Sequence, residues 1–332
     1  MTTHIIARAC GLTVEGFMVV PFLYCVAGFV LLGVSGEALL RGAVTTANRI
    51  NVPPLLIGLT VIAFGTSIPE LTVSLNAARS GNPDIAVGNV VGSNIANILL
   101  VLGAMAVFRS FTVDTGTLNR DGRVMLGVSV LMVVMALNGV ITQWMGMGLL
   151  AILAVFTLML YRAARQESDV SEAAASVDNN LLEGSFFLAL LMLLAGLAGV
   201  LWGSDLMVRG AVGMAQQVGI SQAVIALSIV AIGTSLPELF ISLFASLRGH
   251  ASLAIGNIIG SNISNILLIL GVVASLGPLN ISAEIANRDV WIMLGVAILG
   301  LVLMRSARRM SRMEGLLSLL LYALYVGYLY LA

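Results

Sequence analysis

Long apolar stretches that are almost free of charge recur along the whole 332-residue sequence. A helix needs about 20 mostly apolar residues to cross a bilayer. Ten candidate spans lie near residues 17–36, 55–79, 85–108, 123–142, 144–161, 184–206, 221–247, 252–276, 289–304 and 314–331. Only 10% of the residues are charged, against about 25% in a typical soluble domain. The sequence therefore predicts an all-α polytopic membrane protein with ten transmembrane helices, and it excludes a soluble or disordered chain.

One strongly polar stretch lies near the middle of the chain. Residues 163–183 are rich in acidic and small residues, which predicts a short linker rather than a domain. Alternate connections, counted from the one after the first span, carry 12 of the 16 basic residues. Cytoplasmic loops are enriched in basic residues. We therefore predict that both termini lie outside, that the linker is cytoplasmic, and that the protein lies in a plasma membrane.

Several other classes of protein are excluded by charge and cysteine content. The formal net charge is zero, and no basic segment suits a nucleic-acid partner. Cys10 and Cys25 are the only cysteines, too few for a disulfide framework or a thiolate metal site. The spans hold no cluster of catalytic or metal-ligating His and Cys side chains. Neither an enzyme nor a bound cofactor is predicted, and no obligate protein partner is evident.

Two motifs occur once in each half of the sequence, at a constant offset of 168 residues. Gly-Thr-Ser-Ile-Pro-Glu at 65–70 returns with one change at 233–238, and Gly-Asn-Val-Val-Gly-Ser-Asn-Ile-Ala-Asn at 88–97 returns in similar form at 256–265. Apolar composition does not explain matched Glu, Pro, Ser and Asn inside membrane spans. We predict a duplication, with one five-span repeat in 1–162 and another in 184–332.

An odd number of spans per repeat has a consequence for orientation. The second repeat then enters the membrane upside down relative to the first. Inverted repeats of this kind are typical of transporters, whose site lies at the bilayer midplane between the halves. The sequence therefore favours a transporter over a channel, which would use similar oxygen ligands.

The glutamates of the first motif, Glu70 and Glu238, lie inside apolar spans without an arginine in either motif. A charge at mid-bilayer costs at least about 2.5–3.5 kcal/mol, so each side chain must face the interior and find a partner. Two buried carboxylates without a basic neighbour repel each other. A bound cation or a proton relieves this repulsion, and we expect the two to compete.

Hydroxyl and amide side chains accompany each glutamate at helical spacing. Thr66 and Ser67 precede Glu70 by four and three residues, on the same helix face. The full set of such oxygen donors is Thr66, Ser67, Ser93 and Asn97 in the first half and Thr234, Ser235, Ser261 and Asn265 in the second. The prolines before the glutamates also remove a backbone donor and free a carbonyl oxygen one turn earlier. An all-oxygen shell of this kind suits Ca²⁺ or Na⁺.

For the other polar and small residues near the motifs, we first consider a role in helix packing. Gly256 and Gly260, like their counterparts in the first half, form a small-xxx-small step that lets two helices approach closely. For Asn94 and Asn262 the sequence leaves a helix-packing role and an ion-binding role equally open. Two acidic residues at span ends, Glu37 and Asp205, each precede an arginine by four residues, which predicts structural ion pairs.

These motifs resemble the α-repeats of the cation/calcium exchanger superfamily, the group that contains the sodium/calcium exchangers. Both elements occur in both halves, and the resemblance covers nearly the whole chain. It implies ten helices in two inverted repeats, with the motif helices as a central core. It also implies that Glu70 and Glu238 bind Ca²⁺ in alternation with Na⁺ or H⁺. Thr66 and Thr234 would then contribute backbone oxygens, and the remaining donors would contribute side-chain oxygens.

The sequence departs from this family at one ligand position. Sodium/calcium exchangers commonly carry an Asp at one of the two positions that Asn97 and Asn265 occupy here. The site then has at most two carboxylate charges, which matches one Ca²⁺ and leaves the counter-ion open between Na⁺ and H⁺. The short linker resembles that of compact prokaryotic members, in a bacterial inner or an archaeal membrane. Together these features predict a secondary antiporter that exports Ca²⁺ in exchange for Na⁺, or alternatively for H⁺.

Overall fold

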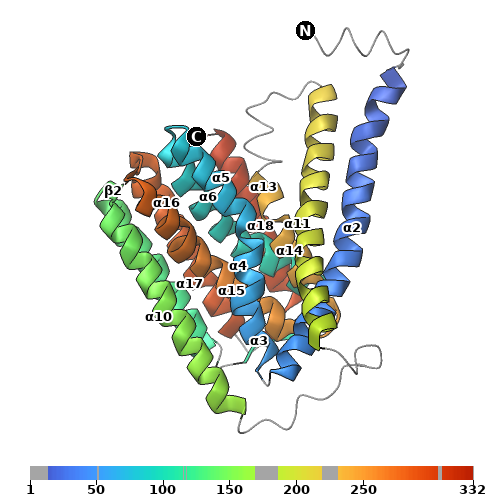
Figure 1. Cartoon of the computed structure of the whole chain (residues 1–332). Helices are drawn as coiled ribbons and strands as arrows, with labels where there is room; N and C mark the ends of the chain where they lie inside the picture. Colours follow the sequence, from blue (N-terminus) through green and yellow to red (C-terminus); the bar gives the residue numbers. More distant parts are fainter. Residues whose placement is uncertain are drawn as a thin grey trace.

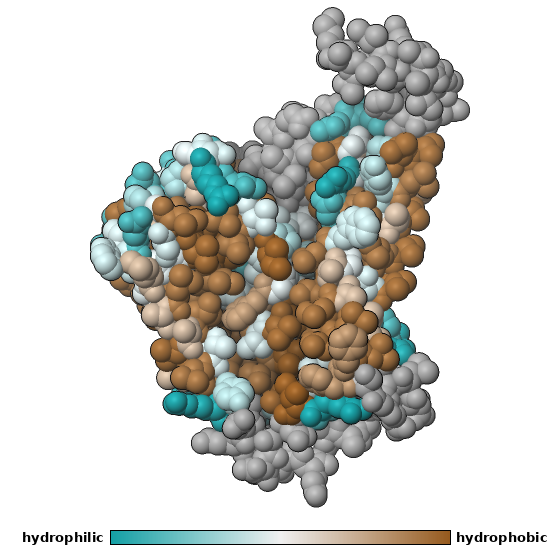
Figure 2. Space-filling view, in the orientation of Figure 1, coloured by the Kyte–Doolittle hydropathy of each residue, from teal (hydrophilic) through white to brown (hydrophobic). Residues whose placement is uncertain are grey.

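In the computed structural model, residues 14–50, 52–114, 116, 118–168, 186–218, 231–305 and 309–331 are described. They are almost entirely helical, apart from two pairs of two-residue strands. Seven helices of the described chain are long and apolar enough to cross a membrane. Hydrophobic side chains cover the middle of the face in Figure 2, and hydrophilic ones gather at its upper and lower ends. The predicted all-helical polytopic membrane architecture is confirmed.

The elements of the first half follow one another as continuous or broken helices. They are α2 (Val14–Arg49); α3 (Pro54–Ile57), π-helical η1 (Gly58–Ile62), α4 (Ala63–Thr66) and α5 (Ile68–Arg79); α6 (Pro83–Ala96), π-helical η2 (Asn97–Leu102) and α7 (Gly103–Phe108); β1 (Phe111–Thr112); π-helical η3 (Leu118–Gly122) and α9 (Arg123–Leu137); β2 (Val140–Ile141); and α10 (Gln143–Ser168). The predicted linker falls largely on residues 169–185, outside the described residues.

The second half repeats this order. Its elements are α11 (Phe186–Gln217); α13 (Ala231–Thr234) and α14 (Leu236–Leu247); α15 (Ala251–Ser264), π-helical η5 (Asn265–Leu270) and α16 (Gly271–Leu276); β3 (Leu279–Asn280); π-helical η6 (Ile285–Asp289) and α17 (Val290–Arg305); β4 (Arg309–Met310); and α18 (Arg312–Leu331). The beginning of the predicted span 221–247 lies outside the described residues.

The sequence repeat is also a structural repeat. α5 and α14, α6 and α15, η2 and η5, and α7 and α16 all begin and end 168 residues apart, and so do β1 and β3. The short strands join the halves, because β1 pairs antiparallel with β4 and β2 pairs antiparallel with β3. The two halves of the chain are therefore built alike and held together by reciprocal contacts.

Helices α2 and α11 lie side by side at the right of Figure 1 and are longer than predicted. They span 36 and 32 residues, whereas the apolar pattern predicts 17–36 and 184–206. The difference arises because the helices continue past the apolar stretches into segments whose charges pair along the helix. Arg41 binds Glu37 at 2.7 Å and Arg209 binds Asp205 at 2.8 Å. These two predicted ion pairs are confirmed.

The contact between α2 and α11 is made by glycines and runs antiparallel. A Cβ atom on Gly28 would lie 2.6 Å from the Gly203 carbonyl oxygen, and one on Gly42 would lie 2.8 Å from that of Ala189 and overlap the backbone of Leu193. Early residues of one helix thus meet late residues of the other. The two backbones approach so closely that no side chain separates them.

Helices α6 and α15 form the buried centre of the molecule. Most residues of the spans Pro83–Phe108 and Ala251–Leu276 are buried, whereas in the most apolar stretches of α2, α10 and α11 most residues are not. Glycine again permits the closest approach, because a Cβ on Gly256 or Gly260 would lie 2.6 Å from the carbonyl oxygen of Leu55 or Leu59, respectively. This confirms the small-xxx-small prediction for the second half. The central position places the second motif of each half in the core.

Candidate ion-binding site

Each glutamate of the first motif lies directly after a break in its helix. Ser67, with φ −77° and ψ 3°, separates α4 from α5, and Ser235, with φ −87° and ψ 5°, separates α13 from α14. The proline two residues later lacks an N–H and fits best in the first turn of a helix. Glu70 and Glu238 therefore lie in the first turns of α5 and α14. Free N–H groups and the helix dipole favour negative charge there.

The two glutamates are brought together from opposite halves of the chain. Glu70 and Glu238 are each 1% exposed, and their carboxylates are close enough to repel each other. The Glu70 carboxylate lies beside the Thr234 side chain, and the Glu238 carboxylate lies beside the hydroxyls of Thr66 and Ser261. Each glutamate thus faces a threonine of the other half. That threonine lies directly before the helix break of its own half.

All ten predicted site residues are buried. They are Thr66, Ser67, Glu70, Ser93, Asn97, Thr234, Ser235, Glu238, Ser261 and Asn265. Several of them touch across the halves: the Thr66 and Ser261 hydroxyl oxygens are 3.4 Å apart, and the Ser67 hydroxyl lies 3.1 Å from that of Ser264. Helix α5 packs against η5, which begins at Asn265, and α14 packs against η2, which begins at Asn97. Of the predicted set, Thr66, Glu70, Thr234, Glu238 and Ser261 therefore lie together at the contact between the halves.

A cluster of buried polar atoms in this region has no hydrogen-bond partner among the described residues. The cluster comprises all four carboxylate oxygens of Glu70 and Glu238, both amide atoms of Asn97, the Oδ1 of Asn265 and the Oγ of Ser235. Buried polar atoms are normally paired, because leaving one unpaired costs about 1–3 kcal/mol. Seven of these eight atoms can accept, so a positively charged group is the partner that satisfies them together.

The donor set fits a hard cation better than a soft one. Nowhere in the described chain do three or more His, Cys, Asp or Glu side chains gather as a metal-binding group. The acceptors here are two carboxylates with neutral hydroxyl and amide oxygens. Ca²⁺ and Na⁺ prefer such oxygens, whereas Zn²⁺ and Cu⁺ prefer nitrogen and sulfur.

Asn89 and Asn257 support the glutamate helices, and the sequence reasoning missed them. The Asn89 amide donates to the Glu70 carbonyl oxygen at 3.1 Å and to the Ser74 hydroxyl at 3.0 Å. In the second half, the Asn257 amide donates to the Ser242 hydroxyl at 3.0 Å. These bonds tie α6 to α5 and α15 to α14. The signal that could have found them is the 168-residue offset, which relates Asn89 to Asn257 and Ser74 to Ser242.

Ion pairs and a capping arginine hold one end of the core. Arg248, next to the end of α14, binds Glu37 of α2 at 2.8 Å. The guanidinium of Arg109 donates to the carbonyl oxygens of Leu247 at 2.6 Å and Ser246 at 3.4 Å. These contacts join α2, α14 and the β1 connection at a single end of the molecule.

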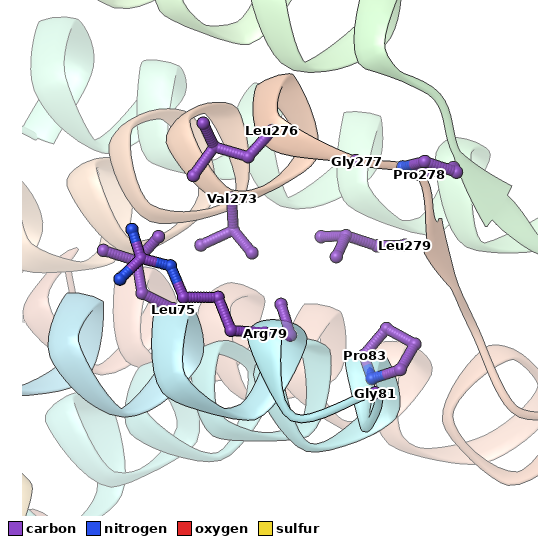
Figure 3. Close-up of a pocket in the computed structure, with 10 residues that line it drawn as sticks. Leu75, Arg79, Gly81, Pro83, Val273, Leu276, Gly277, Pro278 and Leu279 are labelled. Carbon is purple, nitrogen blue, oxygen red and sulfur yellow. The ribbon is translucent and has the colours of Figure 1, made fainter.

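The equivalent place in the other half of the repeat is a cavity. Gly277 lies 168 residues after Arg109 and lines a cavity of about 310 Å³ with residues of α5, α16 and β3. Figure 3 shows Val273 and Leu279 pointing into it, with the Arg79 side chain at one side. The missing side chain at Gly277 leaves this end of the core less filled than the end that Arg109 occupies.

Comparison with known proteins identifies the family. The model of the family described as sodium/calcium exchanger protein matches residues 20–162 and 188–331. The putative antiporter CaxA of Alkalimonas amylolytica is 39% identical over 322 residues, which cover 95% of this chain and 99% of CaxA. The sodium/calcium exchanger MaX1 of Methanosarcina acetivorans is 30% identical over 345 residues, which cover 94% of this chain and 99% of MaX1.

The fold agrees with a solved relative. A structure of the sodium-calcium exchanger NCX_Mj superimposes with a TM-score of 0.80 at 32% identity and covers 92% of this chain and 97% of that one. These named relatives are exchangers and antiporters, which accords with a chain that is a transporter and not an enzyme. The chain belongs to the sodium/calcium exchanger family of integral membrane proteins.

Proposed function

We propose that this protein is a secondary active antiporter that exports Ca²⁺ in exchange for Na⁺, with Glu70 and Glu238 as the central ion ligands. The observation that carries the proposal is the pair of buried carboxylates from opposite halves, whose four oxygens have no hydrogen-bond partner among the described residues. Relatives named as a sodium/calcium exchanger and as an antiporter support the same activity.

Charge balance gives the coupling rule. Two carboxylates are neutralised by one Ca²⁺, by two Na⁺ or by two protons. A loaded site is neutral and can be closed off from water inside the low-dielectric core. The empty site carries two uncompensated charges, so closing it off from water meets a large desolvation penalty. The site therefore switches from one side of the membrane to the other when an ion is bound, and does not switch when it is empty. Exchange follows from that restriction.

The remaining predicted donors complete the ion shell in this proposal. Thr66 and Thr234 contribute backbone oxygens at the helix breaks, and Ser67, Ser93, Ser235 and Ser261 contribute hydroxyls. Asn97 and Asn265 contribute amide oxygens. Burial of all of these side chains supports the assignment, as does the position of both asparagines at the start of a π-helical segment. Such π-helical turns occur frequently at functional sites.

We infer that the chain forms ten transmembrane helices in two inverted repeats, 1–162 and 184–332, joined by the 163–183 linker. The antiparallel packing of α2 on its repeat counterpart α11 supports inversion. The reciprocal strand pairs support it as well. Besides the seven long helices, the ten include α9 with η3, the broken helix that ends with α14, and α18. The arginine distribution supports external termini and a cytoplasmic linker in a plasma membrane.

Proton-coupled Ca²⁺ export is the second candidate. The observation that favours it is the pair of neutral side chains at Asn97 and Asn265. With only two carboxylates, the site balances the charge of two monovalent ions and not three. Two protons satisfy this balance as well as two Na⁺ do.

Calcium flux into sealed vesicles separates these candidates. Purified protein is reconstituted into liposomes, the membrane potential is clamped with K⁺ and valinomycin, and uptake of radioactive Ca²⁺ is driven by an outward Na⁺ gradient or an outward H⁺ gradient. We expect uptake with the Na⁺ gradient and none without a gradient. Uptake with the H⁺ gradient alone selects the second candidate. Equal uptake with no gradient, together with single-channel currents, would contradict antiport.

A further inference from the structure

The repeat-related residues Asn94 and Asn262 make different contacts. The Asn94 amide nitrogen crosses to the other half and donates to the backbone carbonyl of Asn262 at 3.2 Å. The Asn262 amide nitrogen instead donates to Ile258, one turn back in its own helix, at 2.8 Å. Both side chains are buried, at 2% and 4% exposure. The core is therefore asymmetric at a point where the sequence is symmetric.

The contact of Asn94 with a backbone carbonyl determines how two amide groups are turned. A backbone carbonyl oxygen can only accept, so the Asn94 Nδ2 must face Asn262. The Asn94 Oδ1 then faces the other way, where it accepts a hydrogen bond of 3.0 Å from the Nδ2 of Asn265. This leaves the Oδ1 of Asn265 pointing away from Asn94. That oxygen is buried and has no partner among the described residues.

Asn97, the repeat counterpart of Asn265, lacks such an anchor. Within the described chain neither its Nδ2 nor its Oδ1 has a hydrogen-bond partner. The residue that would mirror Asn94 is Asn262, and its amide is already bonded to its own helix. The two asparagines at equivalent positions therefore differ: one amide is held in a defined orientation, and the other is not.

We propose that Asn94 is a positioning residue that keeps the Oδ1 of Asn265 turned toward the transported cation, whereas the Asn97 amide has no such anchor among the described residues. The inference rests on the proposed function, because it assumes that Asn265 is an ion ligand. An amide held with its oxygen inward pays no reorientation cost when the ion arrives. Without Asn94, the Asn265 amide also adopts the flipped orientation, which presents an N–H to the cation and opposes binding.

Replacing Asn94 by leucine tests this role. Leucine has a similar size but neither donates nor accepts, so Asn94→Leu releases the Asn265 amide. We expect the Ca²⁺ concentration for half-maximal exchange to rise about tenfold, with the maximal rate changed by less than about twofold. Asn262→Leu is the matched control, because among the described residues the Asn262 side chain bonds its own helix and its backbone carbonyl is retained. It should leave the half-maximal concentration within about twofold of the parent value.

A double variant separates positioning from packing. In Asn265→Asp both side-chain oxygens are acceptors, so the orientation of the group no longer matters. Because the Asn94 Oδ1 would face a carboxylate oxygen in that background, adding Asn94→Leu to Asn265→Asp should not raise the Ca²⁺ concentration for half-maximal exchange. Ca²⁺-dependent thermal stabilisation of the purified variants provides a binding readout that is independent of flux. Asn94→Ser, whose side chain is too short to reach both partners, replaces Asn94→Leu if the latter does not fold.

The outcomes distinguish failure of the positioning role from failure of the proposed function. If Asn265→Ala weakens Ca²⁺ binding and Asn94→Leu does not, the positioning role is wrong while the site assignment stands. Equal losses for Asn94→Leu and Asn262→Leu, or an undiminished effect of Asn94→Leu in the Asn265→Asp background, would also overturn positioning in favour of packing. If Asn265→Ala and the glutamate variants all bind Ca²⁺ normally, the proposed function itself fails.

Discussion

The guanidinium of Arg109 donates a 2.6 Å hydrogen bond to the backbone carbonyl of Leu247, the last residue of α14. The final carbonyls of a helix lack intrahelical partners and carry the negative end of its dipole. Arg109, which lies between α7 and β1, therefore caps the C-terminal end of α14. The first turn of the same helix holds Glu238. This contact links the periphery of the protein to the candidate site through a single helix.

We predict that Arg109→Ala lowers the stability of the protein in detergent by about 1–2 kcal/mol, because charged hydrogen bonds contribute about that much at a partly exposed site. The measurement is the midpoint of thermal unfolding. Gly277→Ala is the control at the repeat-related position, where an added Cβ meets nothing within 4 Å among the described residues. Equal midpoints for the parent and Arg109→Ala would show that the cap contributes nothing.

Neutralising either glutamate should abolish exchange without unfolding the protein. Glu70→Gln and Glu238→Gln keep the size of the side chain but remove one of the two charges that balance Ca²⁺. We expect a loss of at least about 100-fold in Ca²⁺ flux, because charged ligands dominate binding of hard cations. The thermal midpoint should not fall, since a buried repulsive pair is relieved. Asp205→Asn, in an exposed ion pair on α11, serves as the control. Retained flux in both glutamine variants would remove the glutamates from the mechanism.

The glycine contact between α2 and α11 predicts position-dependent effects of alanine. A Cβ on Gly42 would overlap the backbone of Leu193, whereas one on Gly33 of the same helix meets nothing within 4 Å among the described residues. Gly42→Ala should therefore cost about 1–3 kcal/mol through overpacking. Gly33→Ala should be neutral or stabilising by up to about 1 kcal/mol, because alanine favours a helix. Thermal unfolding of the two variants tests this, and similar midpoints would contradict the close approach.

Stability should fall in mild acid because of His250. Burial lowers the pKa of His250 below its ordinary value of 6.5. Below that pH the unfolded chain binds a proton that the folded protein does not, so the stability present at higher pH is lost as the pH falls toward the folded-state pKa. His250→Asn keeps a residue suited to the N-cap of α15. The drop in thermal midpoint between about pH 7.5 and about pH 5.5 should be smaller in this variant. An unchanged drop would assign the effect to other groups.

The sequence was informative where polar residues interrupt apolar helices. Glu70 and Glu238 stand out because a charge inside a span demands a reason, and the 168-residue repeat then identifies their companions. The prolines two residues after Ser67 and Ser235 account for the helix breaks there, whereas Pro21 lies within the continuous helix α2. Each of these features can be read from residue types and their spacing along the chain, without knowledge of tertiary contacts.

Features that depend on contacts between distant segments cannot be predicted from the sequence pattern. The apolar pattern underestimated α2 and α11, because their extra turns are held by glycine packing and paired charges rather than by lipid exposure. The different partners of Asn94 and Asn262 cannot be read from two identical motifs. That asymmetry exists only after the halves have packed together.

The placement of each glutamate in the first turn of a half-helix has a consequence for ion release. A helix N-terminus is equivalent to about half a positive elementary charge. Two such ends at the same site therefore relieve part of the repulsion between the two carboxylates. The proposed ion site thus attracts a divalent ion less strongly than a bare carboxylate pair would. For the proposed antiporter, which must release its ion on the far side in every cycle, this weaker attraction favours release.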